Sequence, residues 1–181
     1  MNNLSISYFD SSRGRGMVAA TAHGLCSVHL PGDHAISEIE AQNRQEAASD
    51  ISREAAGMLT DYFKGIPQPF EKLPIDLSLV HGGFRRAVLE FARTIRFGEI
   101  RTYGQLAAAI GSPHAARAIG GAMAANPVPV IIPCHRVVAS DGRLTGYSAP
   151  GGIHMKHFLL RLEGVDFTDE RVKIPTGVIH K

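Results

Sequence analysis

The stretch that organises this chain reads YGQLAAAIGSPHAARAIGGAMAAN, residues 103–126. Its spacing predicts a short helix over 104–110 that ends at the following glycine. Ser112 and Pro113 then suit the N-cap and the first turn of a second helix over 115–125. Two short helices joined by a tight turn predict a helix-turn-helix, the unit with which many proteins enter a DNA groove.

The second predicted helix is unusual because Arg117 is its one charged residue, set among alanines and glycines. A helix that reads base edges in the major groove needs polar side chains, which this one lacks. Small residues suit either tight packing against a neighbouring helix or close approach of a sequence-blind helix to a DNA groove. We favour the groove, with Arg117 as its probe, because the positive charge of the chain lies in the same half.

The charge of the chain is distributed unevenly. Residues 1–81 carry six Lys or Arg and ten Asp or Glu, whereas residues 82–162 carry ten and three. A basic block is the electrostatic signature of a protein that binds a polyanion, although a solvated basic surface gives the same composition. The helix-turn-helix in this block favours nucleic acid.

A second motif follows at once, the run IIPCHRVV over residues 131–138. A lone buried cysteine usually serves packing, but one with a base nearby can be a nucleophile. If this run is extended, Cys134 and His135 point to opposite faces, so we expect a bridging water to link them. Prolines at 127, 129 and 133 exclude helix and predict an extended, stiff segment that brings Cys134 behind the second helix.

The composition of the 181 residues, 44% hydrophobic and 20% charged, is that of an ordinary globular protein. No stretch approaches the roughly 18 apolar residues of a membrane span, and no secretory signal is visible at the N-terminus. We therefore expect a cytoplasmic protein that does not bind membranes. With two cysteines, Cys26 and Cys134, it has no disulfide framework, and we expect both thiols to be reduced.

The pattern of the chain predicts an α+β fold. Alternation over 4–9 and 25–30 predicts strands, and a helix is expected over 46–64. From 84 onward helical spacing dominates. We expect a small β-rich N-terminal domain of structural role over 1–80, a mainly helical DNA-binding domain over 81–164 that carries the cysteine run, and a C-terminal extension over 165–181 of unassigned role.

A DNA module without base-reading side chains, joined to a histidine-assisted thiol, predicts chemistry on a base, which must first be flipped out of the duplex. The segment 84–164 resembles the alkylguanine-DNA alkyltransferases, also called methylated-DNA-protein-cysteine methyltransferases. The motifs that carry the resemblance are GEIRTY (98–103), ARAIGGAM (116–123), Asn126-Pro127, PCHRVV (133–138) and GYS (146–148).

The resemblance implies repair of DNA by a single, irreversible transfer of a methyl or other alkyl group from the exocyclic oxygen of guanine, and possibly of thymine, to Cys134. A relay from the cysteine through water to His135 and Glu163 would activate the thiol, while Tyr103 assists the leaving purine and turns the nucleotide outward. By the same resemblance Arg117 fills the gap in the base stack and Asn126 braces the turn. Further contacts are expected for DNA (Tyr103, Ala116, Gly120, Gly121 and Arg136) and for the guanine pocket (Met123, Val137, Tyr147 and Ser148).

Some members of this family hold zinc in the N-terminal domain, but this domain offers Cys26 and three histidines. Cys26 and His29 lie at an odd spacing in a predicted strand and so face opposite sides, which favours packing. We expect no metal and no cofactor. The expected partner is double-stranded DNA bearing alkylated guanine, bound by a monomer.

Three other functions fit parts of the sequence. A non-catalytic protein that binds alkylated DNA would share the helix-turn-helix but replace the cysteine, which is present here. A helix-turn-helix transcriptional regulator would need polar residues in the second helix. A cysteine hydrolase would need a histidine from elsewhere in the fold and an oxyanion hole, and the sequence marks neither.

Overall fold

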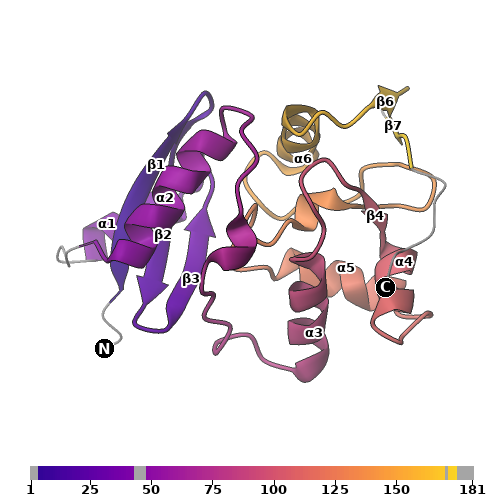
Figure 1. The fold of residues 1–181 in the computed structure, drawn as a ribbon, viewed down its shortest axis with the longest axis horizontal. Helices are drawn as coiled ribbons and strands as arrows, with labels where there is room; N and C mark the ends of the chain where they lie inside the picture. Colours follow the sequence, from indigo (N-terminus) through magenta and orange to yellow (C-terminus); the bar gives the residue numbers. More distant parts are fainter. Residues whose placement is uncertain (1–3, 43–47, 170, 175–181) are drawn as a thin grey trace. The chain divides into compact units, whose positions relative to one another are not determined.

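The structure is a computed structural model that describes residues 4–42, 48–169 and 171–174. The chain forms two compact units, Met1–Leu79 with Pro127–Ile131, and Val80–Asn126 with Ile132–Lys181. The first contains a three-stranded sheet with helices, and the second is mainly helical (Figure 1). The predicted α+β class is confirmed.

The first unit is built on an antiparallel sheet in the order β1-β2-β3. Its strands are β1 (Ser5–Ser11), β2 (Gly14–Thr21) and β3 (Gly24–His29). Two of these were predicted, whereas β2 was not, because its sequence GRGMVAAT lacks the alternation of a half-buried strand. Five consecutive residues of β2, from Gly16 to Ala20, are buried.

Helix α2 (Asp50–Tyr62) covers one face of this sheet (Figure 1). It begins four residues later than predicted, because the hydroxyl of Ser49 accepts the backbone N–H of Ser52 as an N-cap. Its buried stripe includes Leu59 and Tyr62. A shorter helix, α1 (Ala35–Gln42), was not predicted. A 3-10 turn, η1 (Phe70–Lys72), follows α2.

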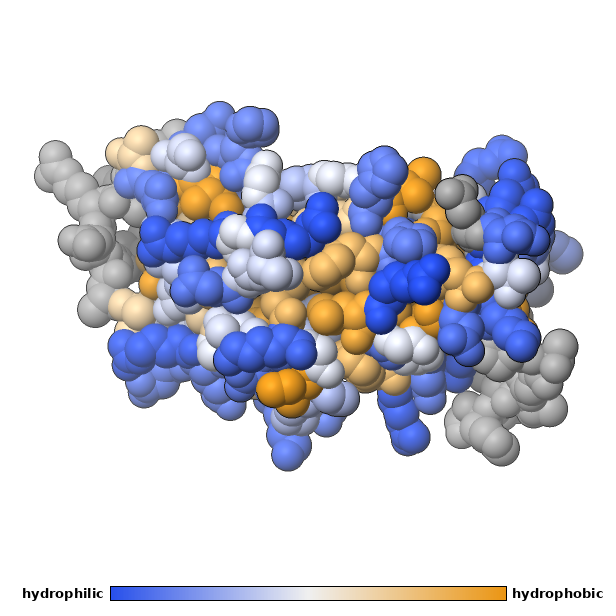
Figure 2. Space-filling model, turned by 90° about the horizontal axis from the view of Figure 1, so that it is seen from above, coloured by the Kyte–Doolittle hydropathy of each residue, from blue (hydrophilic) through white to orange (hydrophobic). Residues whose placement is uncertain are grey.

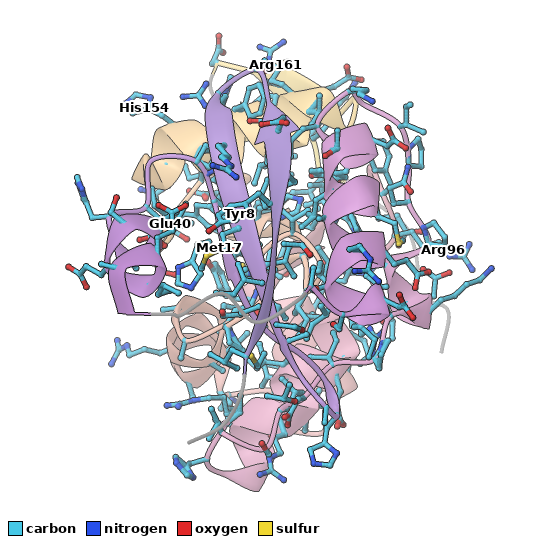
Figure 3. All side chains as sticks on the ribbon, turned by 90° about the vertical axis from the view of Figure 1, so that its left-hand side faces the viewer. Tyr8, Met17, Glu40, Arg96, His154 and Arg161 are labelled. Carbon is cyan, nitrogen blue, oxygen red and sulfur yellow. The ribbon has the colours of Figure 1, made fainter. Side chains whose placement is uncertain are left out.

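Figure 3 shows the side chains where strand β1 lies near helix α1. Tyr8 on β1 lies opposite Met17 on β2, and Glu40 of α1 lies near Tyr8. Burial and the Glu40 carboxylate raise the pKa of Tyr8. The guanidinium of Arg15 stacks on the same ring at 3.7 Å from its centroid, a cation–π contact.

The second unit begins with α3 (Gly83–Ala92), followed by a two-residue parallel pairing of β4 (Arg101–Thr102) with β5 (Val137–Val138). This pairing connects the start of the helix-turn-helix to the end of the cysteine run. Helix α4 (Tyr103–Ala109) begins with a capping box between Thr102 and Gln105.

Helix α5 (Ala116–Ala124) completes the helix-turn-helix. Its N-cap is Ala115, without a side-chain bond, so the prediction that Ser112 caps it is wrong. Ser112 instead accepts the N–H of Ala115 through its backbone carbonyl at 2.9 Å, which forms a turn before the helix begins. The unit ends with α6 (Gly152–Leu162) and a hairpin of β6 (Phe167–Thr168) and β7 (Arg171–Val172).

The segment 127–136 departs from the predicted extended course. Val130 has a φ of 74°, a conformation that β-branched residues rarely adopt. Cys134–Arg136 form a single 3-10 turn, η2. Adjacent side chains therefore do not alternate between two faces here, and the geometric premise for the separation of Cys134 and His135 was wrong.

In the described residues, no helix is long and apolar enough to cross a membrane. Figure 2 shows one face of the molecule, on which hydrophilic residues predominate and apolar residues lie between them.

Candidate functional site

A pocket of about 540 Å³ opens in the second unit, between the helix-turn-helix and the loop that precedes α6. Two of its walls come from α4 and α5, and another from the loop 145–148. The sulfur-bearing residue Cys134 also lines it. The complete lining is Tyr103, Ala116, Arg117, Gly120, Met123, Ala124, Cys134, Thr145, Gly146, Tyr147 and Ser148.

Cys134 is 5% exposed and its sulfur has polar neighbours. The side-chain amide of Asn126 donates to Sγ at 3.2 Å and to the carbonyl of Ile132 at 2.8 Å. Burial raises the pKa of the Cys134 thiol, and the Asn126 amide, the Lys156 charge and the Tyr147 hydroxyl act in the opposite direction. The thiol is therefore protonated at rest, and the donors around it are placed to stabilise a thiolate once it forms.

Directly behind the cysteine, His135 and Arg136 both bind Glu163. His135 Nε2 lies 2.8 Å from Glu163 Oε1, and Arg136 donates to both carboxylate oxygens at 2.8 Å. Gly98 adds a backbone N–H to Oε2 at 3.1 Å. The Glu163 side chain is fully buried, yet His135 and Arg136 overcome that burial and hold the pKa of the carboxyl well below its usual range.

This hydrogen-bond network determines the protonation state and the tautomer of His135. Burial lowers the pKa of His135, against the attraction of Glu163, so its imidazole is neutral. Because Nε2 lies against a carboxylate, which only accepts hydrogen bonds, Nε2 carries the proton of the neutral ring. Nδ1 is then the basic nitrogen. The structure thus brings together His135 and Glu163, the two residues of the relay that the family resemblance implies.

Lys156 of α6 is a functional candidate that the sequence analysis missed. It is fully buried, and its ammonium donates to the carbonyls of Val137 at 2.6 Å and Thr145 at 3.1 Å. Burial lowers the pKa of Lys156 to about 8, although the charge of Cys134 opposes the shift. The buried stripe of α6 is Met155, Lys156, Leu159 and Leu160. The lysine therefore occupies a core position of the helix, and this helical spacing is the signal that could have identified it.

Two tyrosines flank the sulfur. Burial raises the pKa of Tyr103, while a bond with the Thr145 side chain lowers it. Tyr147 is buried, and burial together with Cys134 raises the pKa of its hydroxyl well above the usual value. Both hydroxyls are therefore protonated at neutral pH and can donate to a group bound in the pocket.

Helix α5 presents small residues outward and apolar ones inward. Ile119, Ala122 and Met123 are buried, whereas Arg117 is exposed. A Cβ added to Gly121 would meet nothing within 4 Å, so close packing does not explain this glycine. The open face agrees with the preferred sequence interpretation, a helix that approaches another surface closely.

Three predicted contact residues lie outside the pocket lining. Gly121 is exposed on α5. Val137 is fully buried in β5 and contributes its carbonyl to Lys156 rather than its side chain to the pocket. The Arg136 side chain is 7% exposed, and its guanidinium is bound to Glu163 and the carbonyl of Ile95, which favours a role as a buried ion-pair partner over the expected DNA contact.

The candidate zinc ligands of the first unit have other contacts. Cys26 Sγ donates to the Ala19 carbonyl at 3.5 Å, and His29 Nδ1 lies 2.8 Å from Asp33. Over residues 4–42, 48–169 and 171–174, no three His, Cys, Asp or Glu side chains are grouped to hold a metal ion. Of the tail, the hairpin up to residue 174 is described, whereas Pro175 and Gly177 lie outside the described residues.

Comparison with known proteins identifies relatives across most of the chain. Residues 83–165 match the family described as 6-O-methylguanine DNA methyltransferase, DNA binding domain. A methylated-DNA–protein-cysteine methyltransferase of Methanosarcina acetivorans is 37% identical over 158 residues, which is 86% of this chain and 96% of that protein. The crystal structure of the Mycobacterium tuberculosis O6-methylguanine methyltransferase has a TM-score of 0.72 and 33% identity, covering 89% of this chain and 93% of that one. A structure of the same M. tuberculosis protein in complex with DNA has a TM-score of 0.70, 33% identity, and coverage of 88% and 92%.

Proposed function

The chain belongs to the 6-O-methylguanine DNA methyltransferase family, and we propose that it repairs DNA by transferring the methyl group of 6-O-methylguanine to its own Cys134. The observation that carries the assignment of the acceptor is the position of this sulfur. It lines a pocket beside α5, with a hydrogen-bond donor at 3.2 Å and a buried His–Glu pair directly behind it.

The first step of the proposed reaction is removal of the thiol proton. His135 Nδ1 accepts it through a water molecule, and the resulting imidazolium is stabilised by the Glu163 carboxylate at 2.8 Å from Nε2. The thiolate is stabilised by the Asn126 amide and by the Lys156 ammonium. A buried thiolate with few solvent contacts is a strong nucleophile.

In the second step the thiolate attacks the methyl carbon. The S–C bond forms as the C–O bond breaks, and its electron pair leaves with the purine. Tyr103 donates a hydrogen bond to the purine and so stabilises the charge that develops on it. The product is S-methylcysteine, a thioether that nothing in the pocket can cleave, so each molecule reacts once.

The target base must leave the duplex to reach this pocket. We propose that Ala116 and Gly120 of α5, which line the pocket, allow the backbone of double-stranded DNA to approach, and that Arg117 fills the gap left by the extruded nucleotide. The M. tuberculosis relative solved in complex with DNA supports DNA as the partner. We propose that the protein acts as a monomer.

Two of the other functions are disfavoured by the same geometry. A non-catalytic binder of alkylated DNA has no use for a thiol with donors placed to stabilise its anion. A transcriptional regulator that reads sequence needs polar side chains on the open face of α5, where the described residues offer Arg117 alone among alanines and glycines.

The test is transfer of a labelled methyl group from a duplex containing 6-O-methylguanine. We expect about one methyl per protein molecule, located on the peptide that contains Cys134 by mass spectrometry. Cys134→Ser should abolish transfer and retain DNA binding. Cys26→Ser is the matched control and should react normally. Transfer of several equivalents, or label on another residue, would contradict the proposal.

A further inference from the structure

The described part of the C-terminal tail forms a hairpin whose role the proposed function does not explain. β6 and β7 pair with Phe167 opposite Val172 and Thr168 opposite Arg171. The turn between them includes Asp169, with a φ of 49°. Phe167 packs on α6, from which His154 and Arg161 project in Figure 3: its ring lies 5.0 Å from the Arg161 guanidinium.

Backbone contacts join this hairpin to the chain that leads into the pocket. The N–H of Val172 donates to the carbonyl of Gly142 at 2.8 Å, and Arg143 forms an antiparallel bridge with Arg171. Arg171 also lies 3.5 Å from the Asp141 carboxylate. A Cβ at Gly142 would lie 2.3 Å from the Val172 carbonyl oxygen, and Gly142 has a φ of 79°, so the contact requires glycine.

Apolar packing holds the same two segments together. Val172 is 3% exposed in a core cluster with Leu160 and Val165, and Leu144 packs against that cluster. Leu144 is followed directly by Thr145, the first residue of the pocket wall over 145–148. The hairpin is thus connected to the wall through residues 142–144. Gly142 accepts a backbone hydrogen bond from Val172, and Leu144 packs against the cluster that contains Val172.

We propose that the β6–β7 hairpin determines which adducts the pocket accepts, by fixing the position of the wall over 145–148. The inference rests on the proposed function. The wall has a second anchor in the bond from Lys156 to the Thr145 carbonyl at 3.1 Å, so the hairpin and α6 hold it together. With one anchor released, the wall can move outward, which makes room for a bulky adduct and weakens the alignment that a small methyl group needs.

The experiment weakens the hairpin contact without altering the pocket lining. Val172→Ala removes packing, and Gly142→Ala places a methyl group against the Val172 carbonyl. Rate constants for transfer are measured with duplexes containing 6-O-methylguanine and 6-O-benzylguanine. Each is normalised to the fraction of molecules that reacts at the end point, so that misfolded protein does not enter the result.

We expect the benzyl-to-methyl rate ratio to rise about tenfold in both variants, the range that a change of pocket fit produces. Val172→Ile, which keeps the packing, should restore a ratio near that of the native protein. Thr168→Ala, at an exposed position of the same hairpin, should leave the ratio unchanged.

The experiment distinguishes failure of the hairpin inference from failure of the proposed function. A ratio equal to the native one in Val172→Ala and Gly142→Ala, with both rates normal or reduced in proportion, would show that the hairpin is only structural and would overturn the inference. Failure of the native protein to accept either group would overturn the proposed function itself.

Discussion

The two units of the molecule bury polar side chains of different kinds. In the described part of the first unit the buried polar side chains are serines: Ser7 and Ser52 share a hydrogen bond of 2.9 Å between α2 and β1. In the second unit His135, Arg136 and Glu163 form a buried ion-paired group, and the buried Lys156 acts electrostatically on both Cys134 and His135.

The contrast between buried hydroxyls in the first unit and buried charges in the second indicates a structural role for the former and a chemical role for the latter. A buried hydroxyl pair is neutral and satisfied, so it costs little and joins a helix to a sheet. Buried ions cost several kcal/mol each to desolvate, and apolar side chains of similar volume are often at least as stable. The buried ions lie beside Cys134, where a developing negative charge needs partners, so we infer that they are kept for chemistry more than for stability.

Removing the carboxylate tests this comparison most severely. Glu163→Gln leaves Arg136 buried without its counter-ion and removes the support of an imidazolium at His135. We expect the transfer rate to fall about 100-fold or more. The free energy of unfolding should fall by about 3 kcal/mol, the cost of breaking a buried ion pair. Chemical denaturation and end-point-normalised transfer measure the two effects, and an unchanged rate would contradict the relay.

Glu163→Gln should also change how the free energy of unfolding depends on pH in acid. The pKa of Glu163 is lower in the folded protein than in the unfolded chain, so its stabilising contribution is full above about pH 4.3 and is lost as the pH falls further. Denaturation of the native protein should therefore steepen below that pH, and Glu163→Gln should show a shallower slope. Equal slopes would mean that the carboxylate has no unusual pKa.

Lys156→Met tests the buried ammonium. The variant keeps an apolar chain of similar length but loses the bonds to the Val137 and Thr145 carbonyls and the positive charge near Cys134. We expect the transfer rate to fall about 10-fold to 100-fold. Lys64→Met, in the turn after α2, where the side chain is 60% exposed, is the matched control and should react normally.

The pH dependence of stability provides a second test of Lys156. Its pKa is about 8 in the folded protein, below that of about 10.4 in an unfolded chain, so below pH 8 burial of the charged form costs stability. This cost is relieved as the pH rises from 8 toward 10.4. Relative to Lys156→Met, the native protein should gain stability across that window, and a constant difference would contradict the burial of the charge.

Arg117→Ala should have a smaller effect on binding than on chemistry. If Arg117 fills the place of the extruded base, its loss reduces the flipped population, and we expect transfer from duplex DNA to fall about 10-fold while affinity for undamaged duplex changes little. Arg53→Ala, on an exposed position of α2, is the control. Equal losses of affinity and transfer would reduce Arg117 to a general phosphate contact.

The smallest effect is expected in the first unit. Ser52→Ala removes one partner of the buried hydroxyl pair, so the free energy of unfolding should fall by about 1 kcal/mol with no change in the normalised transfer rate. The double variant Ser7→Ala with Ser52→Ala should lose less than the sum of the single losses, because the pair shares one bond. A reduced transfer rate would mean that this unit contributes to the chemistry.

Local patterns predicted much of the architecture. The stripe of α2, the two helices of the helix-turn-helix and the glycine that follows the first of these helices depend on neighbouring residues, and they lie within a few residues of their expected places. β2 was missed because five consecutive buried residues fit neither the alternation of a half-buried strand nor the spacing of an amphipathic helix. The N-cap at Ser112 was wrong because a turn formed by its carbonyl precedes the helix.

The fold class, the helix-turn-helix, the family, and the presence of a cysteine with a histidine beside it could be predicted from the chain alone, because each follows from residues close together in the chain. Which charges are buried together became known from the three-dimensional arrangement. Arg136 was expected on DNA and is bound to Glu163, and Lys156, which the sequence analysis missed, is buried where its charge acts on Cys134. Such contacts join residues that are far apart in the chain, and their energies depend on desolvation, which local spacing does not encode.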